Sequence, residues 1–154
     1  MEKRSNFCVI PDFFSEAECE EYVKVIEDLC LLRNKTSLGS NRYDIVLDSD
    51  KLEKLKERLP ETMECTSRVT LRKYAKNSPG IAKHQDLILE NGVKYVGIVY
   101  LNGDVPEGET VLYTEEGEIT ISPETGKLLV FDIGMFHEGK APKGLKYIFI
   151  FRMR

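Results

Sequence analysis

Residues 95–121 read YVGIVYLNGDVPEGETVLYTEEGEITI, and this stretch decides the class of fold. It holds three short runs rich in β-branched and aromatic residues, which the turn pairs Asn102-Gly103 and Glu116-Gly117 separate. These runs are predicted to be strands: Tyr95–Leu101, Thr110–Tyr113 and Glu118–Ile121.

Runs of the same kind lie on both sides of this stretch. Short strands at such intervals indicate a sandwich or barrel of antiparallel strands. Tyr147–Phe151 is apolar on both faces, so we expect it to be a central strand with helices on one side. The further predicted strands are Phe7–Ile10, Arg68–Tyr74, Ala82–Leu89, Lys127–Phe131 and Tyr147–Arg152.

Two helices are predicted near the N-terminus. Ser15 and Glu18 form a capping-box pattern at the start of the first, and apolar residues then recur at helical spacing from Cys19 to Cys30. The second is expected over Ser49–Leu59, where Pro60 ends it. No repeat or linker divides the chain, so we expect one mainly β (α+β) domain over residues 1–154.

The composition is that of an ordinary globular protein, with 42% hydrophobic and 31% charged residues. The formal net charge of −4 argues against a nucleic-acid partner, because such binding depends on clustered Lys and Arg. No segment approaches the roughly 20 apolar residues of a membrane span, and the N-terminus does not read as a signal peptide. We therefore expect a cytoplasmic protein without a membrane partner. Its four cysteines form no CxxC pair and are expected to be free thiols.

The chain contains two histidines, His84 and His137. Residues two apart on a strand point to the same face, so His84 and Asp86 can present an imidazole and a carboxylate side by side while Gln85 faces away. His137 follows the apolar strand Lys127–Phe131 by a short turn. Two histidines and one carboxylate that leave other coordination positions open are typical of non-haem iron(II) oxygenases.

Lys146 follows His137 by nine residues and opens the last predicted strand. It shares strand parity with Ile148 and Ile150, so it is expected at one end of an apolar row facing the interior. A buried ammonium needs an anion, and the distal carboxylate of 2-oxoglutarate would provide one.

Several motifs in order resemble the iron(II)/2-oxoglutarate-dependent dioxygenases, and within them the prolyl 4-hydroxylase-like branch. His84-Gln85-Asp86 is similar to the family's HxD segment, and Gly134–Tyr147 to the segment from the last ligand histidine to the basic residue. Other matching segments are Leu71–Tyr74, Tyr100–Asn102, Glu107–Thr110, Ile121–Asp132 and Ile10–Ser15. Glu107 departs from the pattern, because it stands where the family usually has Gly.

The resemblance implies a double-stranded β-helix (jelly-roll) core with the two N-terminal helices packed on one sheet. It implies that His84, Asp86 and His137 bind iron(II), and that Lys146 pairs with 2-oxoglutarate, helped by Tyr74, Thr110 and Tyr100. Dioxygen would be the second co-substrate, with ascorbate as a candidate auxiliary reductant. The implied reaction is hydroxylation, preferably of a prolyl residue in a protein or peptide, coupled to decarboxylation of 2-oxoglutarate to succinate and CO2.

The segment 34–44 is predicted to be a loop. Its residues Lys35-Thr36-Ser37 and Gly39 resemble the segment that closes over the peptide in prolyl hydroxylases, and we expect Arg42 or Tyr43 to contact substrate. Two other functions are open at this point. One is an AlkB-like nucleic-acid demethylase, in which an Arg such as Arg152 or Arg154 would bind 2-oxoglutarate. The other is a jelly-roll binding module without turnover.

Overall fold

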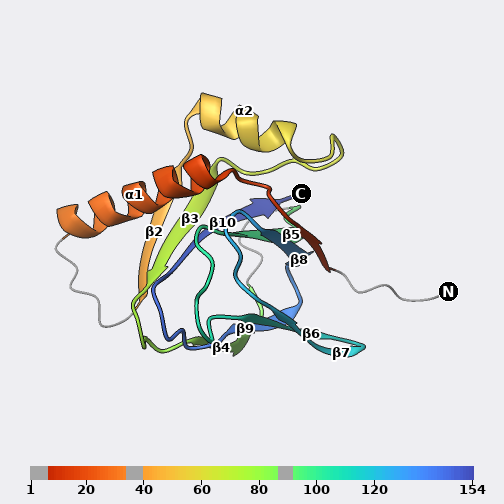
Figure 1. The fold of residues 1–154 in the computed structure, drawn as a ribbon. Coiled ribbons are helices and arrows are strands. Elements are labelled where there is room, and N and C mark those ends of the chain that lie inside the picture. The colour runs from red at the N-terminus through yellow and green to blue at the C-terminus, as the bar shows by residue number, and fades with distance from the viewer. Residues whose placement is uncertain (1–6, 34–39, 87–91) are drawn as a thin grey trace.

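Two antiparallel sheets face one another and carry the fold (Figure 1). The computed structural model describes residues 7–33, 40–86 and 92–154. The larger sheet has the strand order β1-β8-β5-β10-β3-β2, and the smaller has the order β4-β9-β6-β7. The strands of the two sheets are β1 (Phe7–Ile10), β2 (Ser40–Val46), β3 (Arg68–Tyr74), β4 (Ile81–His84), β5 (Tyr95–Tyr100), β6 (Thr110–Thr114), β7 (Gly117–Ile121), β8 (Leu128–Asp132), β9 (Phe136–Gly139) and β10 (Lys146–Met153).

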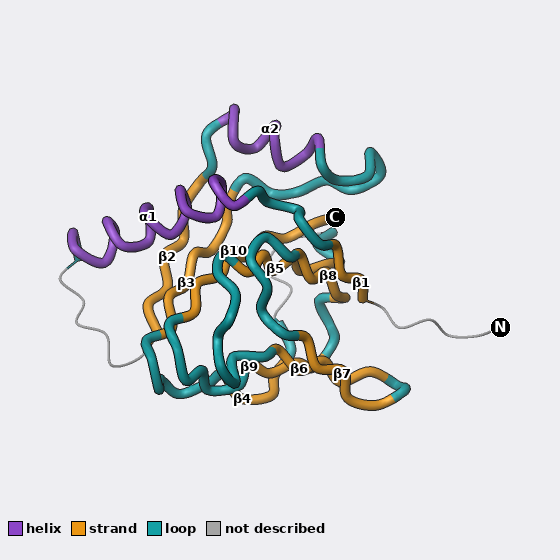
Figure 2. Tube along the Cα trace, in the orientation of Figure 1, coloured by secondary structure: helices purple, strands orange, loops and turns teal. Residues whose placement is uncertain are grey.

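The described connections between the two sheets are loops rather than helices (Figure 2). Two sheets of antiparallel strands joined in this way form the jelly roll that the motif resemblance implies, so the predicted fold class is confirmed.

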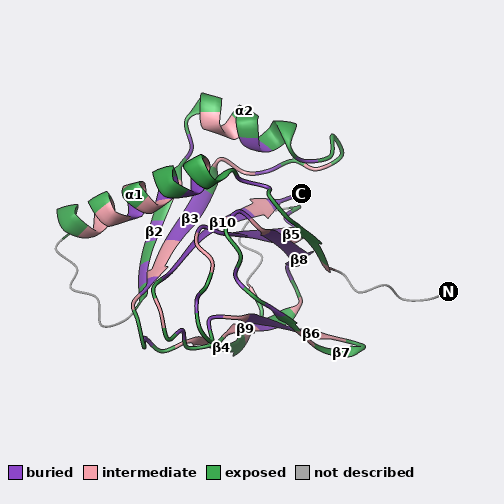
Figure 3. Cartoon of the chain, viewed as in Figure 1, coloured by how far each residue is buried: buried purple, intermediate pink, exposed green. Residues whose placement is uncertain are grey.

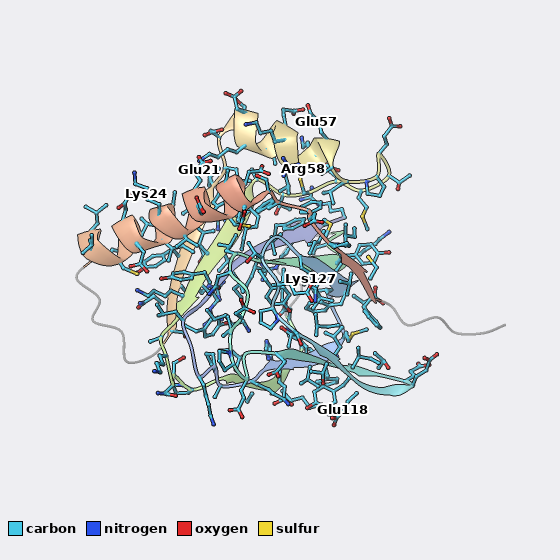
Figure 4. The ribbon with its side chains drawn as sticks, in the orientation of Figure 1. Glu21, Lys24, Glu57, Arg58, Glu118 and Lys127 are labelled. Carbon is cyan, nitrogen blue, oxygen red and sulfur yellow. The ribbon has the colours of Figure 1, made fainter. Side chains whose placement is uncertain are left out.

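Both helices lie on the larger sheet, on the side away from the smaller one (Figure 1). Helix α1 (Glu16–Leu32) has the predicted capping box, in which the Ser15 side chain accepts from the backbone of Glu18. Helix α2 (Ser49–Glu57) is capped by Asp48. Arg58, which follows α2, lies between the two helices (Figure 4), 2.8 Å from the Glu18 carboxylate.

Strand β10 separates two apolar cores, because its side chains alternate between the two faces of the larger sheet. Phe149 and Phe151 pack against α1 residues such as Tyr22, in the core between helices and sheet. Ile148 belongs to the second core, between the two sheets, with Tyr100 and residues of the facing strands. Figure 3 shows buried segments, in purple, along β10, β5 and β8 of the larger sheet. The prediction of a central strand covered on one side by helices is confirmed.

The structure corrects three sequence predictions. Residues 40–44, expected in a loop, begin strand β2, while residues 34–39 lie outside the described part of the chain. Strand β4 ends at His84, so Asp86 follows the strand instead of lying within it. His137, expected at a strand edge after a short turn, lies within β9, a strand that the sequence did not predict. The short strands were missed because their residues are polar or mixed, and it is pairing with a neighbouring strand that holds them extended.

The described helices include none that is both long and apolar enough to cross a membrane. All four cysteines are free, as expected.

Candidate active site

Neighbouring strands of the smaller sheet bring the two histidines together. His84, the last residue of β4, is the register partner of His137 on β9, and their ring centroids are 4.2 Å apart. Asp86 lies two residues beyond the end of β4, with Oδ1 3.4 Å from Nε2 of His84 and 3.6 Å from Nε2 of His137. The candidate ligand atoms of these three residues all lie within 4.8 Å of one another.

The other ring nitrogens orient both imidazoles. Nδ1 of His84 donates to the carbonyl of Ala82 at 2.7 Å, and Nδ1 of His137 donates to the carbonyl of Met135 at 3.0 Å. Each bond leaves Nε2 as the lone-pair nitrogen, which is how a metal-binding histidine is normally prepared. Burial lowers the pKa of His137, which favours its neutral form. Two imidazole nitrogens and one carboxylate suit iron(II) and leave further coordination positions open.

The triad opens into a cavity of about 320 Å³ between the two sheets. Lys146, the first residue of β10, lines this cavity and is only 4% exposed. Its ammonium lies 5.3 Å from the ring centroid of Tyr74 and 5.8 Å from that of Tyr100. None of the ion pairs in the described part of the chain includes Lys146.

The pKa of Lys146 is lowered to about 8, chiefly by burial; Glu109 acts in the opposite direction, and Arg72 contributes to the lowering. A desolvated ammonium that forms no ion pair with the described carboxylates is a site that attracts an anion. Thr110 also lines the cavity, and its hydroxyl is hydrogen-bonded to the Tyr100 hydroxyl at 2.6 Å. Tyr74 lines the cavity directly, while Tyr100 is fully buried behind Thr110. The predicted co-substrate residues are therefore grouped around one buried cation.

The two residues predicted to contact substrate point in opposite directions, as neighbours on a strand must. Arg42 lines the cavity. Tyr43 is fully buried between α1 and the larger sheet, where its hydroxyl donates to Sγ of Cys30 at 3.1 Å and the Arg33 guanidinium lies over its ring. Tyr43 is therefore a core residue, and its predicted contact with substrate is wrong.

Two further arginines line the cavity, Arg72 and Arg152. From the sequence, Arg152 is a candidate only as a 2-oxoglutarate ligand of the AlkB-like alternative, and Arg72 belongs to a basic run, 68–83, expected to be a solvated rim, with the steering of an acidic substrate as the alternative. Strand parity could have placed both in the cavity, because Arg72 shares a face of β3 with Tyr74 and Arg152 shares a face of β10 with Lys146. Gln85, expected to face away, contributes to the cavity wall, and its amide donates to the carbonyl of Gly134 at 2.6 Å.

No family model matches the sequence, and no curated protein does. Solved structures do match the fold. A viral collagen prolyl hydroxylase from Paramecium bursaria Chlorella virus-1, solved as a 2-oxoglutarate complex, matches at a TM-score of 0.74 and 18% identity, over 97% of this chain and 96% of that one. This chain has the fold of the iron(II)/2-oxoglutarate oxygenases.

Two other similar structures show the range of chemistry found on this fold. A prolyl hydroxylase from Trichoplax adhaerens, in complex with a hypoxia inducible factor peptide fragment, matches at a TM-score of 0.73 and 18% identity, over 97% of this chain and 83% of that one. A non-haem alpha-ketoglutarate-dependent carbocyclase from nogalamycin biosynthesis matches at 0.77 and 11% identity, over 97% of this chain and 79% of that one. At these sequence identities the similarity establishes the oxygenase fold and does not identify the substrate.

Proposed function

We propose that the protein is an iron(II)- and 2-oxoglutarate-dependent hydroxylase. The observation that carries this proposal is the combination of the His84–Asp86–His137 cluster with the buried, unpaired Lys146 in one cavity. A binding module without turnover would need neither a three-donor cluster with open positions nor a desolvated cation beside it, since each costs stability.

Each residue of the site has a defined task. His84, Asp86 and His137 would hold the metal ion, and the Ala82 and Met135 carbonyls fix the orientation of the two rings. Lys146 would pair with the distal carboxylate of 2-oxoglutarate beside the Tyr74 ring and the Thr110 hydroxyl. With dioxygen, iron(II) and 2-oxoglutarate together supply the oxidising power that hydroxylates an unactivated C–H bond. The apolar walls, including Ile148 and Ile150, limit the access of water to the reacting groups.

The preferred substrate is a prolyl residue of a protein or peptide. Several of the solved structures similar to this chain are prolyl hydroxylases, and one of these was solved with a peptide. The motif resemblance points to the same branch. The carbocyclase has the same fold, which shows that this architecture also supports reactions other than prolyl hydroxylation.

The first experiment is an anaerobic titration of the apo-protein with iron(II) and 2-oxoglutarate, following the visible charge-transfer band of the chelate. We expect the band in the wild type, its loss in His84→Ala, and a much weaker affinity for 2-oxoglutarate in Lys146→Ala. Prolyl peptides are then incubated under air, and mass spectrometry measures the gain of one oxygen atom. A folded wild type that gives no band would refute the proposed function.

An AlkB-like demethylase is the second candidate, because Arg152 lines the cavity in addition to Lys146. It predicts that Arg152→Ala abolishes 2-oxoglutarate binding while Lys146→Ala leaves it intact. The burial of Lys146, and the net charge of −4, favour the hydroxylase.

A further inference from the structure

Three arginines share the cavity face of the larger sheet with Lys146. Arg42 on β2 and Arg72 on β3 are direct register partners, and Ile148 of β10 is the next residue in the same row. Arg152 lies further along β10, on the same face as Lys146 and Ile148. All three arginines line the cavity that also contains the metal-ligand cluster.

This arrangement is costly in the absence of an anion. Like charges directly opposite one another on neighbouring strands destabilise a sheet, and Arg42 and Arg72 are such a pair. Nε of Arg72 and Nε of Arg152 are both buried, and neither has a hydrogen-bond partner among the described residues. A buried guanidinium N–H without an acceptor is an unsatisfied donor, so the site is prepared for a ligand that supplies acceptors.

The nearby carboxylates do not meet this need. Asp44 lies 3.4 Å from Nε of Arg42 and accepts from the Thr70 hydroxyl at 2.7 Å. Its carboxylate also interacts electrostatically with Arg152, but it accepts no hydrogen bond from Nε of that arginine. Arg72 lies over the Tyr74 ring and donates to the Ser40 hydroxyl at 3.1 Å, and both of these partners are uncharged.

Under the proposed function, 2-oxoglutarate does not supply acceptors for these arginines either. The distal carboxylate of 2-oxoglutarate is assigned to Lys146, and the remaining charges of the co-substrate and Asp86 offset those of the metal ion. Arg42 and Arg152 then share the Asp44 carboxylate, and Nε of Arg72 and Nε of Arg152 still have no acceptor among the described residues, in a cavity that must admit the primary substrate.

We propose that Arg72 and Arg152, with Arg42 at the rim, bind a carboxylate of the primary substrate close to the carbon that is hydroxylated. This inference rests on the proposed function and narrows it to carboxylate-bearing substrates. A guanidinium presents paired donors that match a carboxylate, which makes arginine suited to such recognition. The carboxylate belongs either to a free acid or to an acidic side chain beside the target residue of a peptide. A nucleic-acid phosphate backbone fits less well, because Arg72 and Arg152 are recessed in the cavity and the whole chain is acidic.

The test compares matched acid and amide probes. N-acetylproline is paired with N-acetylprolinamide, and the peptide acetyl-Gly-Pro-Asp-Gly-amide with its Asn counterpart. Calorimetry measures binding to the manganese(II)- and 2-oxoglutarate-loaded protein without oxygen, and succinate formation under air with iron(II) measures turnover. The variants are Arg72→Gln and Arg152→Gln. The control is Arg68→Gln, which removes an arginine of the same strand that is exposed and outside the cavity lining.

We expect the wild type to prefer at least one acid over its amide by about 10- to 100-fold, the usual strength of charged hydrogen bonds. The preference should vanish in Arg72→Gln and Arg152→Gln and persist in Arg68→Gln. Preference for N-acetylproline identifies a free acid as the source, and preference for the Asp peptide identifies an acidic neighbour.

Equal binding of acid and amide, or binding of neither pair, overturns the inference. A raised KM for 2-oxoglutarate with an unchanged acid preference in Arg152→Gln also overturns it, because the arginine would then serve the co-substrate. Turnover of a methylated oligonucleotide in preference to both acids overturns it as well.

Substrate-independent conversion of 2-oxoglutarate to succinate distinguishes failure of the carboxylate inference from failure of the proposed function. If the wild type shows it without any acid preference, the hydroxylase proposal stands and the carboxylate inference fails. If the wild type makes no succinate at all, the proposed function itself fails.

Discussion

At the scale of single residues, Lys146 is a buried charge that costs stability in the protein without an anion. It is buried beside two aromatic rings, and burial lowers its pKa to about 8 from the ordinary value of a lysine. A group whose charged form is disfavoured in the folded state destabilises the protein at pH values where it is still protonated.

Replacing Lys146 with Met should therefore stabilise the apo-protein while weakening co-substrate binding. We expect thermal unfolding at pH 7 to give a gain of roughly 1–3 kcal/mol, since the apolar chain no longer carries a desolvated charge. The affinity for 2-oxoglutarate should fall by about 30-fold or more, the usual cost of truncating one partner of a buried charge pair. The control is Lys143→Met, whose ammonium is exposed and pairs with Glu107, and it should change both quantities little. Loss of stability together with unchanged affinity would contradict the assignment.

The same residue predicts a pH dependence of 2-oxoglutarate binding. Below about pH 8 the free protein already carries the protonated Lys146, so binding has its full strength. Above it the ammonium must first regain its proton, and the affinity should weaken by up to about tenfold per pH unit. Glu109, Arg72, Tyr74 and Tyr100 surround the ammonium.

Anaerobic titrations between pH 6.5 and about 9.5 measure this dependence, and Lys146→Met should remove the decline. If the affinity for 2-oxoglutarate still falls with rising pH in the variant, a group other than Lys146 is titrating.

At the scale of elements, the N-terminal cap of α1 is a local feature that was readable from sequence. Ser15→Ala removes the side-chain acceptor for the Glu18 backbone and should lower the free energy of unfolding by about 1 kcal/mol. Ser49→Ala is the matched control, because Ser49 follows the capping residue Asp48 and is not itself the cap. Denaturant unfolding of both variants provides the comparison. Equal losses in the two variants would show that the capping box contributes nothing specific.

The turn before β8 is held to the N-terminal segment in a way that only glycine allows. Gly126 has φ +82°, and a Cβ there would lie 2.3 Å from the backbone oxygen of Phe14. The Gly126 carbonyl also accepts from the backbone of Phe13 and Phe14. We expect Gly126→Ala to destabilise the protein by about 1–3 kcal/mol in urea unfolding, whereas Gly134→Ala, with nothing within 4 Å of its added Cβ, should be close to neutral. A near-neutral Gly126→Ala would show that the segment shifts freely.

At the scale of the whole molecule, a bound metal ion would connect β4 with β9 and stabilise the smaller sheet. Ligand binding to the native state alone raises the free energy of unfolding by about 2.7 kcal/mol at a concentration of 100 Kd. We expect manganese(II) to raise the melting temperature, a chelator to reverse the rise, and His137→Ala to abolish it. A rise of the same size in His137→Ala would place the ion elsewhere.

Much of the molecule was readable from sequence because the signals are local. The capping box of α1, the run 147–151 with apolar residues on both faces, and the turn pairs between strands each depend on residues within one segment. The spacing of His84, Asp86 and His137 with Lys146 likewise indicated the chemistry, since these side chains have few alternative uses in that order. Their roles as ligands and co-substrate contacts stay predictions until metal and 2-oxoglutarate are titrated.

Tertiary structure alone decided the rest, because strand register is set by partners far apart in the chain. It placed His137 opposite His84, it extended Ser40–Val46 into an edge strand, and it turned Tyr43 into the core while leaving Arg42 at the cavity. The sequence by itself determined which residues are candidates for the chemistry. The pairing of β2, β3 and β10 determined that arginines from these three strands meet Lys146 in one cavity. A sequence pattern within one segment cannot predict this arrangement of like charges, because the strands that pair are far apart in the chain.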